Sequence, residues 1–146
     1  MKRTSARAAR RAVDRYLIHQ NLQHHRVSDG EWALSLPSPA GQDIQVQLRL
    51  GDYTLFLSSF FMRAPEENVL EVYHFLLRKN LELRGAKFGL NEAGDIFLTT
   101  ELPLAALNEE ELDRCLGYLY AYWEQSYGTV LRIGWATHFQ GDDGHH

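Results

Sequence analysis

The run DIQVQLRL, residues 43–50, alternates strictly between apolar and polar side chains. Side chains with this period of two lie on opposite faces of a β-strand, so the run predicts a strand with one dry and one wet face. Gly51 and Asp52 follow as a two-residue turn, and the apolar run YTLFLSSFFM comes directly after them. We therefore expect an antiparallel hairpin whose second strand, residues 53–62, is central in its sheet or covered on both faces.

Two further segments indicate strands. VSDGEWALSLP has a turn at residues 28–30, followed by a short run whose apolar side chains alternate. AKFGLNEAGDIFLTT, residues 86–100, predicts a second hairpin with its turn at residues 91–94, where Gly94 suits a positive φ. The sequence thus predicts three strands followed, after an intervening segment, by two more.

Three segments favour helices. Residues 4–24 contain no glycine or proline and carry apolar side chains at helical spacing, within a basic N-terminal helix expected over residues 1–25. Residues 64–80, APEENVLEVYHFLLRKN, place Pro65 where a first helical turn accepts it. The last helix starts at the capping sequence LNEEEL, and its internal Gly117 indicates a close contact with a neighbouring element.

The segment after the last helix predicts a strand at residues 129–135 and a disordered tail at residues 136–146. The expected order is helix, three strands, helix, two strands, helix. This order predicts an α+β protein, an antiparallel sheet flanked by helices, in a single domain over residues 1–146.

Residues 64–80 carry more apolar surface than one sheet face covers. At about 100° per residue, the apolar side chains fill an arc of about 140°, which Phe75 widens to roughly 200°. Such a helix is either buried wholly within its own chain or packed against a second chain, and the pattern alone favours neither. The residues predicted for an interface with a second chain or a partner are Val69, Val72, Tyr73, Leu76 and Leu77.

The basic residues are concentrated at the start of the chain. The chain has a net charge of −4, whereas residues 1–15 hold six basic residues and one acid. The residues that could contact an anion are Arg3, Arg7, Arg10 and Arg11. A solvated helix face is the favoured interpretation and nucleic acid an unlikely partner, because the acidic remainder of the chain repels DNA; a nucleic-acid-associated regulator is the alternative.

The residues that could carry catalysis or bind metal lack the necessary patterns. Cys115 lies in an apolar stripe between Leu112 and Leu119, where a thiol stays protonated. Seven histidines are present, but none has His-x-x-x-His spacing, and the acidic clusters sit at predicted helix starts. We therefore predict a protein that is not an enzyme and holds no cofactor or metal.

The sequence also predicts a location. No run of about 18 apolar residues is present, and the Arg-rich start has no apolar core, so neither a membrane span nor a secretory signal is expected. The single cysteine agrees with a reducing compartment. These features predict a cytoplasmic protein with no membrane partner.

One stretch resembles a known family. YHFLLRKNLELRGAKFGLNEAGDIFLTTELPLAALNEEELD, residues 73–113, is similar to the YbjN family of bacterial proteins, labelled sensory transduction regulators. The similar features are a Leu-rich helix ending in Asn80, a short strand with Phe88, a Gly-Asp turn at residues 94–95 and an acidic helix start at residues 109–111.

The order of helices and strands resembles this family as well, and together the resemblance covers about two thirds of the chain. It implies a fold like that of the type III secretion chaperones, an α+β sandwich that pairs as a homodimer and binds extended segments of other proteins. It therefore implies a non-enzymatic interaction module, a chaperone-like adaptor or sensory transduction regulator, whose partner segment is unidentified.

Overall fold

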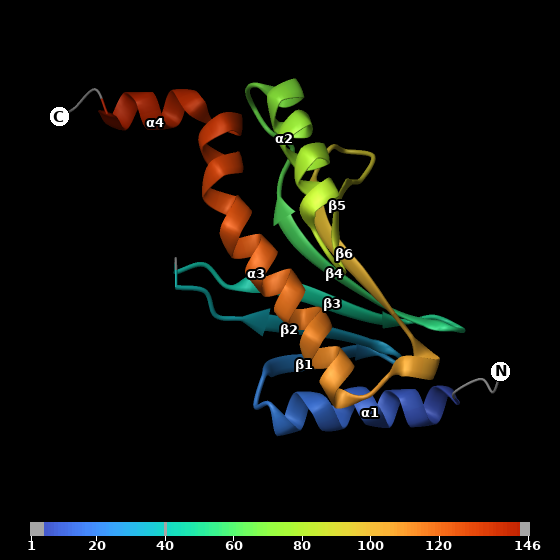
Figure 1. Cartoon of the computed structure of the whole chain (residues 1–146). Coiled ribbons are helices and arrows are strands. Elements are labelled where there is room, and N and C mark those ends of the chain that lie inside the picture. The colour runs from blue at the N-terminus through green and yellow to red at the C-terminus, as the bar shows by residue number, and fades with distance from the viewer. Residues whose placement is uncertain (1–4, 40, 144–146) are drawn as a thin grey trace.

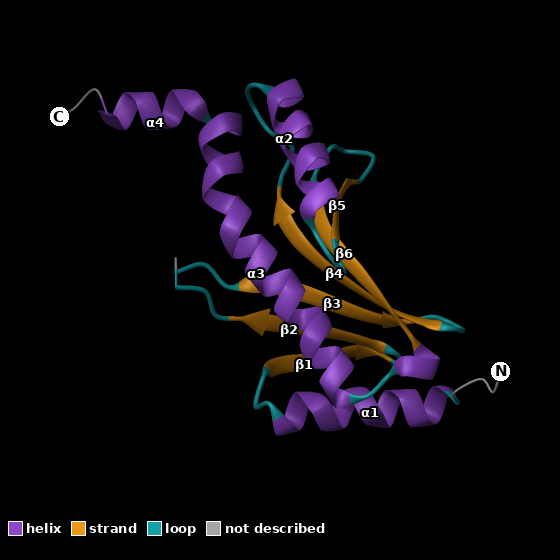
Figure 2. Cartoon of the chain, viewed as in Figure 1, coloured by secondary structure: helices purple, strands orange, loops and turns teal. Residues whose placement is uncertain are grey.

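The computed structural model describes residues 5–39 and 41–143, which form one antiparallel sheet with helices against it (Figure 1, Figure 2). The strands are β1 (Gln23–Ser28), β2 (Glu31–Leu36), β3 (Ile44–Leu50), β4 (Thr54–Met62), β5 (Lys87–Leu90) and β6 (Ile96–Pro103). The α-helices are α1 (Ala6–His19), α2 (Val69–Glu82), α3 (Glu109–Gly134) and α4 (Ala136–Asp143), and a short 3-10 helix, η1 (Leu104–Ala106), precedes α3. The predicted α+β class is confirmed.

The sheet has the strand order β1-β2-β3-β4-β6-β5, with every neighbouring pair antiparallel. Both predicted hairpins are confirmed, because β3 pairs with β4 and β5 pairs with β6. β4 is central, but only one of its faces is fully covered, since the Phe60 side chain on the other face is 45% exposed. α3 crosses the covered face, with α1 beside its first turns and α2 beside its last turns (Figure 1).

The alternation of β3 decides which face is covered. Its apolar residues Ile44, Val46 and Leu48 are buried, and the intervening polar residues are exposed. α1 is held over the same side by two hydrogen bonds: Tyr16 Oη donates to Asp113 Oδ1 of α3 (2.8 Å), and the Trp32 indole of β2 donates to Asp14 Oδ1 (2.9 Å). Burial raises the pKa of Tyr16, so its hydroxyl stays a donor at neutral pH.

The first helix is shorter than predicted. α1 ends at His19, and Asn21, with φ of 53°, reverses the chain in the left-handed conformation that asparagine tolerates. The segment predicted to continue the helix instead forms β1, a strand that the sequence pattern did not predict. Most side chains of β1 are exposed, and its pairing with β2 is what holds it as a strand.

The second helix begins later than predicted, at Val69. Asn68 precedes it with φ of 51° and makes no side-chain cap. Pro65 does not start a helix; it is buried, and its Cβ lies close to Gly134 of α3. Tertiary packing, rather than a helix N-terminus, therefore explains this proline.

The C-terminal part is more helical than predicted. α3 runs through the segment predicted as a strand, because Ser126, Val130 and Gly134 extend its buried stripe at four-residue spacing. α4 then occupies residues 136–143, where a disordered tail was expected, while residues 144–146 lie outside the described part of the chain.

Alanine substitutions at two glycines of α3 should change the stability of the fold in opposite directions. A Cβ at Gly117 would meet nothing within 4 Å, so the expected close contact is not there; at Gly134 it would lie 3.1 Å from Pro65 Cβ. Gly117→Ala should raise the free energy of unfolding by about 1 kcal/mol through helix propensity. Gly134→Ala should lower it by about 1–3 kcal/mol through overpacking. Urea unfolding of both variants measures the difference, and equal effects would contradict this assignment of the contact.

Candidate functional site

The outer side of α2 carries a row of exposed leucines. Leu70 is 83% exposed, Leu77 68% and Leu81 90%, and their spacing of seven and four residues places them on one side of the helix. Leu90, at the end of the edge strand β5, is 47% exposed and shares a hollow of about 340 Å³ with Leu77. We call these four leucines the α2–β5 patch. Within the residues that the structure describes, no segment covers these leucines, and exposed apolar patches are typical of interaction sites.

A single asparagine fixes α2 beside β5. Asn80 Oδ1 accepts a hydrogen bond from the Phe88 backbone N–H (2.8 Å), and Asn80 Nδ2 donates to the Phe88 carbonyl (3.1 Å). The amide thus pairs with the outer edge of β5 as another strand would. Lys87 Nζ donates to the Asn80 carbonyl (2.8 Å) and strengthens the link. An incoming strand therefore finds both polar groups of Phe88 already occupied.

The five residues predicted for the interface are divided by the structure. Val72 and Leu76 are buried in the core, and Tyr73 is half-buried. Val69 and Leu77 are exposed. The prediction left out Leu81, because the helix was expected to end at Asn80. The spacing of four residues from Leu77 was the signal that could have found it.

The predicted anion contacts lie on α1, apart from Arg3, which is outside the described residues. Arg7 and Arg11 are exposed and Arg10 is half-buried. Arg15 continues the spacing of Arg7 and Arg11, so the three guanidinium groups follow one side of the helix. Within the described part of the chain, none of these arginines forms an ion pair.

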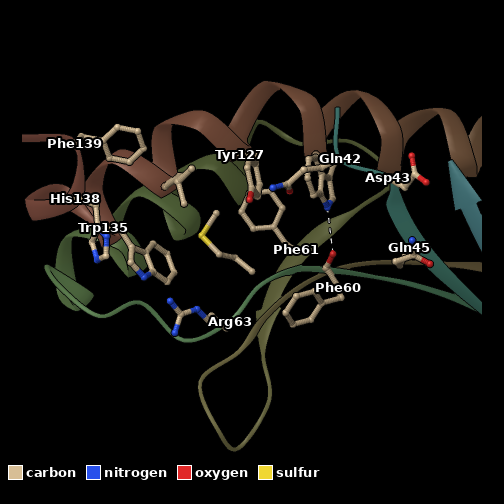
Figure 3. A pocket seen from close by; sticks show the side chains of 13 residues that line it. Gln42, Asp43, Gln45, Phe60, Phe61, Arg63, Tyr127, Trp135, His138 and Phe139 are labelled. Carbon is tan, nitrogen blue, oxygen red and sulfur yellow. Dashed lines mark hydrogen bonds between the residues drawn. The ribbon is translucent and has the colours of Figure 1, made fainter. Parts of the chain in front are cut away.

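A second hollow opens between β3 and β4, beneath α3 (Figure 3). It has a volume of about 460 Å³ and a mostly apolar lining that includes Phe61, Met62 and Tyr127. Trp123 stacks on Tyr127 with ring centroids 4.4 Å apart and planes 7° apart. Figure 3 shows Trp135, His138 and Arg63 toward one end, with Asp43 and Gln45 at the other. We call this hollow the β3–β4 split.

The wall formed by α4 is anchored to the loop before α2. Glu67 Oε1 accepts a hydrogen bond from the Thr137 backbone N–H (3.0 Å), and Glu67 Oε2 accepts one from the Thr137 hydroxyl (2.6 Å). Glu66 contacts both Arg63 (2.8 Å) and His138 (3.3 Å). The hydrogen bond from Arg63 is the main cause that lowers the pKa of Glu66, and the hydroxyl of Thr137 is the main cause for Glu67.

The cysteine and the possible metal ligands considered in the sequence can now be placed in the fold. Cys115 is buried, and burial raises the pKa of its thiol, which marks it as a core residue of α3. Within residues 5–39 and 41–143, no three His, Cys, Asp or Glu side chains gather as a metal site requires. Among the helices described for those residues, none combines the length and the apolar character needed to cross a bilayer.

The architecture defines the fold class. The chain shares its fold with the Yersinia pestis type III secretion chaperone SycH (TM-score 0.58, 18% identity, 79% of this chain and 96% of that chain). The ExsC–ExsE complex gives a TM-score of 0.63 at 18% identity, over 86% of this chain and 95% of that chain. The ExoU–SpcU complex of Pseudomonas aeruginosa gives a TM-score of 0.60 at 16% identity, over 81% of this chain and 96% of that chain. The crystal structure of YbjN from E. coli gives 0.59 at 15% identity, over 80% and 89%.

The family model described as "Putative bacterial sensory transduction regulator", YbjN, matches residues 10–130, and the chain belongs to this family. Uncharacterized proteins Rv0487 of Mycobacterium tuberculosis and ML2442 of Mycobacterium leprae are both 31% identical, over 120 and 116 residues. These matches cover 81% and 78% of the chain, but only 66% and 63% of the relatives' own lengths. The resemblance found in residues 73–113 is thereby confirmed.

The hydrogen bonds between Thr137 and Glu67, which anchor α4, should depend on pH. The folded-state pKa of Glu67 lies below its unfolded value of about 4.3, so its stabilising effect is present above that pH and is lost as pH falls through the folded-state pKa. The amide NMR signal of Thr137 should therefore shift as acid protonates Glu67. Glu67→Gln should abolish that titration. Glu71→Gln, a matched change on the exposed side of α2, should leave it intact. A Thr137 titration that survives Glu67→Gln would contradict the anchor.

Proposed function

We propose that this protein is a non-enzymatic adaptor that works in the cytoplasm as a single-domain homodimer and binds a segment of a partner protein. The observation that carries the proposal is the α2–β5 patch, whose leucines the chain itself leaves exposed. Three comparison structures support the partner role, because each holds a chaperone-like chain in a complex. The family description supports a place in sensory transduction.

A twofold dimer suits the patch physically. In such a dimer the same surface of both chains meets itself, so the α2 leucines of one chain pack against those of its mate. Burying one leucine contributes about 1.5–3 kcal/mol. Because Asn80 already pairs with the edge of β5, the seam rests on side-chain packing rather than on a continuous sheet across the two chains.

The energy balance makes the seam sensitive to single changes. The α2 leucines of two chains together supply on the order of 10 kcal/mol of apolar burial. Association itself costs about 4–15 kcal/mol. Since these magnitudes are close, a charge introduced at the centre of the patch is enough to separate the chains.

Leu77→Glu and Leu81→Glu should each convert the dimer into a folded monomer, because they desolvate a carboxylate at the seam. Sedimentation velocity gives the mass, and circular dichroism shows whether the fold is kept. The matched control is Ile18→Glu, which places the same charge on an exposed apolar position of α1. Leu76 is unsuitable for this test, since it is buried and a charge there destabilises the core. A wild-type monomer, or a dimer untouched by both leucine changes, would refute the α2 seam.

A second candidate function is a nucleic-acid-associated regulator that uses α1. The observation that favours it is a row of three arginines on α1, Arg7, Arg11 and Arg15, that form no ion pair with any other residue in the described part of the chain. If three phosphates are contacted, the logarithm of the binding constant for a DNA duplex should fall with the logarithm of salt concentration at a slope of about −3. Fluorescence anisotropy with a labelled duplex measures the slope. Absence of binding at low salt, or binding unchanged by Arg7→Glu and Arg11→Glu, would eliminate this candidate.

A further inference from the structure

The β3–β4 split begins where the pairing of two central strands stops. β3 starts at Ile44 and β4 runs to Met62, yet their register ends at the pair Val46 and Ser59. Beyond that pair the two strands diverge (Figure 2). The hollow of about 460 Å³ is lined by residues of both strands and of α3. Such a gap within a sheet leaves backbone groups that need other partners.

Two side chains supply such partners, so backbone carbonyls on both sides of the gap are hydrogen-bonded in the folded chain. Ser59 Oγ donates to the Gln45 carbonyl (2.9 Å) on the β3 side. Trp123 Nε1 donates to the Phe60 carbonyl (3.2 Å) on the β4 side. Because both carbonyls are already satisfied, an added strand gains little backbone pairing there. The split is suited to receive a side chain.

The walls are apolar and adaptable. Met62 is a flexible thioether, Leu131 is only half-buried, and the stacked pair of Trp123 and Tyr127 forms a flat wall beside them. The volume of about 460 Å³ is within the range of ligand pockets and exceeds what one large apolar side chain fills. These walls favour a bulky apolar group over a polar one.

The charges at the rim distinguish one end of the split from the other. At one end, Arg63 contacts Glu66 (2.8 Å) and lies over the Trp135 ring (5.3 Å), and Glu66 also meets His138. At the other end, Asp43 has no hydrogen bond or ion pair with any described residue. The uncompensated charge on the lining is therefore negative, and it complements a cation.

We propose that the β3–β4 split binds a bulky apolar side chain of a partner polypeptide, flanked in that polypeptide by a lysine or arginine that meets Asp43. The apolar group lies among Met62, Tyr127 and Leu131, and the cation lies at the rim. This proposal deepens the proposed function, since it names the chemistry of the segment that the adaptor holds. The site is separate from the α2–β5 patch, so the dimer leaves it open.

The test uses two synthetic eight-residue peptides, each with a central leucine in a serine and glycine background. One has lysines beside the leucine and the other has glutamates. Titrated at millimolar concentration into the ¹⁵N-labelled full chain, the lysine peptide should shift the indole N–H signals of Trp123 and Trp135. It should bind about two- to tenfold more tightly than the glutamate peptide, as expected for one rim charge.

Variants make the result specific. Asp43→Lys should reverse the order of the two peptides. Asp29→Lys, the same change at an exposed turn of the β1–β2 hairpin, should leave the order unchanged. Leu131→Trp places a large ring in the hollow beside Met62 and Tyr127, where the apolar group of the peptide would lie, so binding of the lysine peptide should be lost while the circular dichroism spectrum stays native. Equal affinities, shifts centred on α2, or no binding by either peptide would overturn the proposal.

The peptide experiment tests the split separately from the proposed dimer. Asp43→Lys and Leu131→Trp should leave the sedimentation mass of the wild type unchanged, because both residues lie outside the α2–β5 patch. Leu77→Glu should change the mass but keep the binding of the lysine peptide. A monomeric protein that still binds the lysine peptide would refute the dimer alone. A dimer indifferent to both peptides would refute the split alone.

Discussion

The attachment of α2 at both ends determines what the rest of the molecule exposes. At its C-terminal end, the amide of Asn80 holds the backbone of Phe88 in β5. At its N-terminal end, Asn68 Nδ2 donates to the Ile133 carbonyl (2.9 Å), and the Glu67 N–H donates to the Gly134 carbonyl (2.9 Å). These bonds satisfy carbonyls at the end of α3 that have no partner within the helix. They also fix the rotation of α2, so some of its apolar side chains face the core and the others face water.

The left-handed backbone of Asn68 helps to attach the N-terminal end of α2 to α3. Asn68 has φ of 51°, a left-handed conformation that asparagine adopts more readily than most other L-residues. That conformation takes its side chain away from capping α2 and toward the last turn of α3. The helix loses a cap, and the junction of α2 with α3 gains a hydrogen bond. A sequence pattern cannot show this exchange, because the partner lies 65 residues further along the chain.

The sequence predicted the elements whose pattern is local. The alternation in residues 43–50 and the Gly-Asp turn after it were enough to place β3, its hairpin and its buried face. β1 was missed because the polar sequence QHHRVS has no alternation, and its strand exists through pairing with β2. The strand predicted at residues 129–135 was wrong because a short apolar run does not distinguish a strand from the end of a long helix.

The candidate sites were harder to predict than the elements. Helical periodicity gives the width of the apolar arc on α2, but it does not say which half the sheet covers. Val72 and Leu76 were therefore grouped with Leu77, although only Leu77 is exposed. The β3–β4 split had no signal in the sequence, because it depends on where the pairing of two strands ends and on which side chains take over the free carbonyls.

The α2–β5 patch and the β3–β4 split both depend on the loop between β4 and α2 and on the end of α3. The loop between β4 and α2 contributes Arg63 to the wall of the split, and its last residues anchor the start of α2. The end of α3 touches both, since Trp135 lines the split while Gly134 packs against Pro65. A substitution in these two segments would disturb both surfaces together and could not separate their roles. Positions outside them, such as Asp43 on one side and Leu81 on the other, change one surface while the other keeps its geometry.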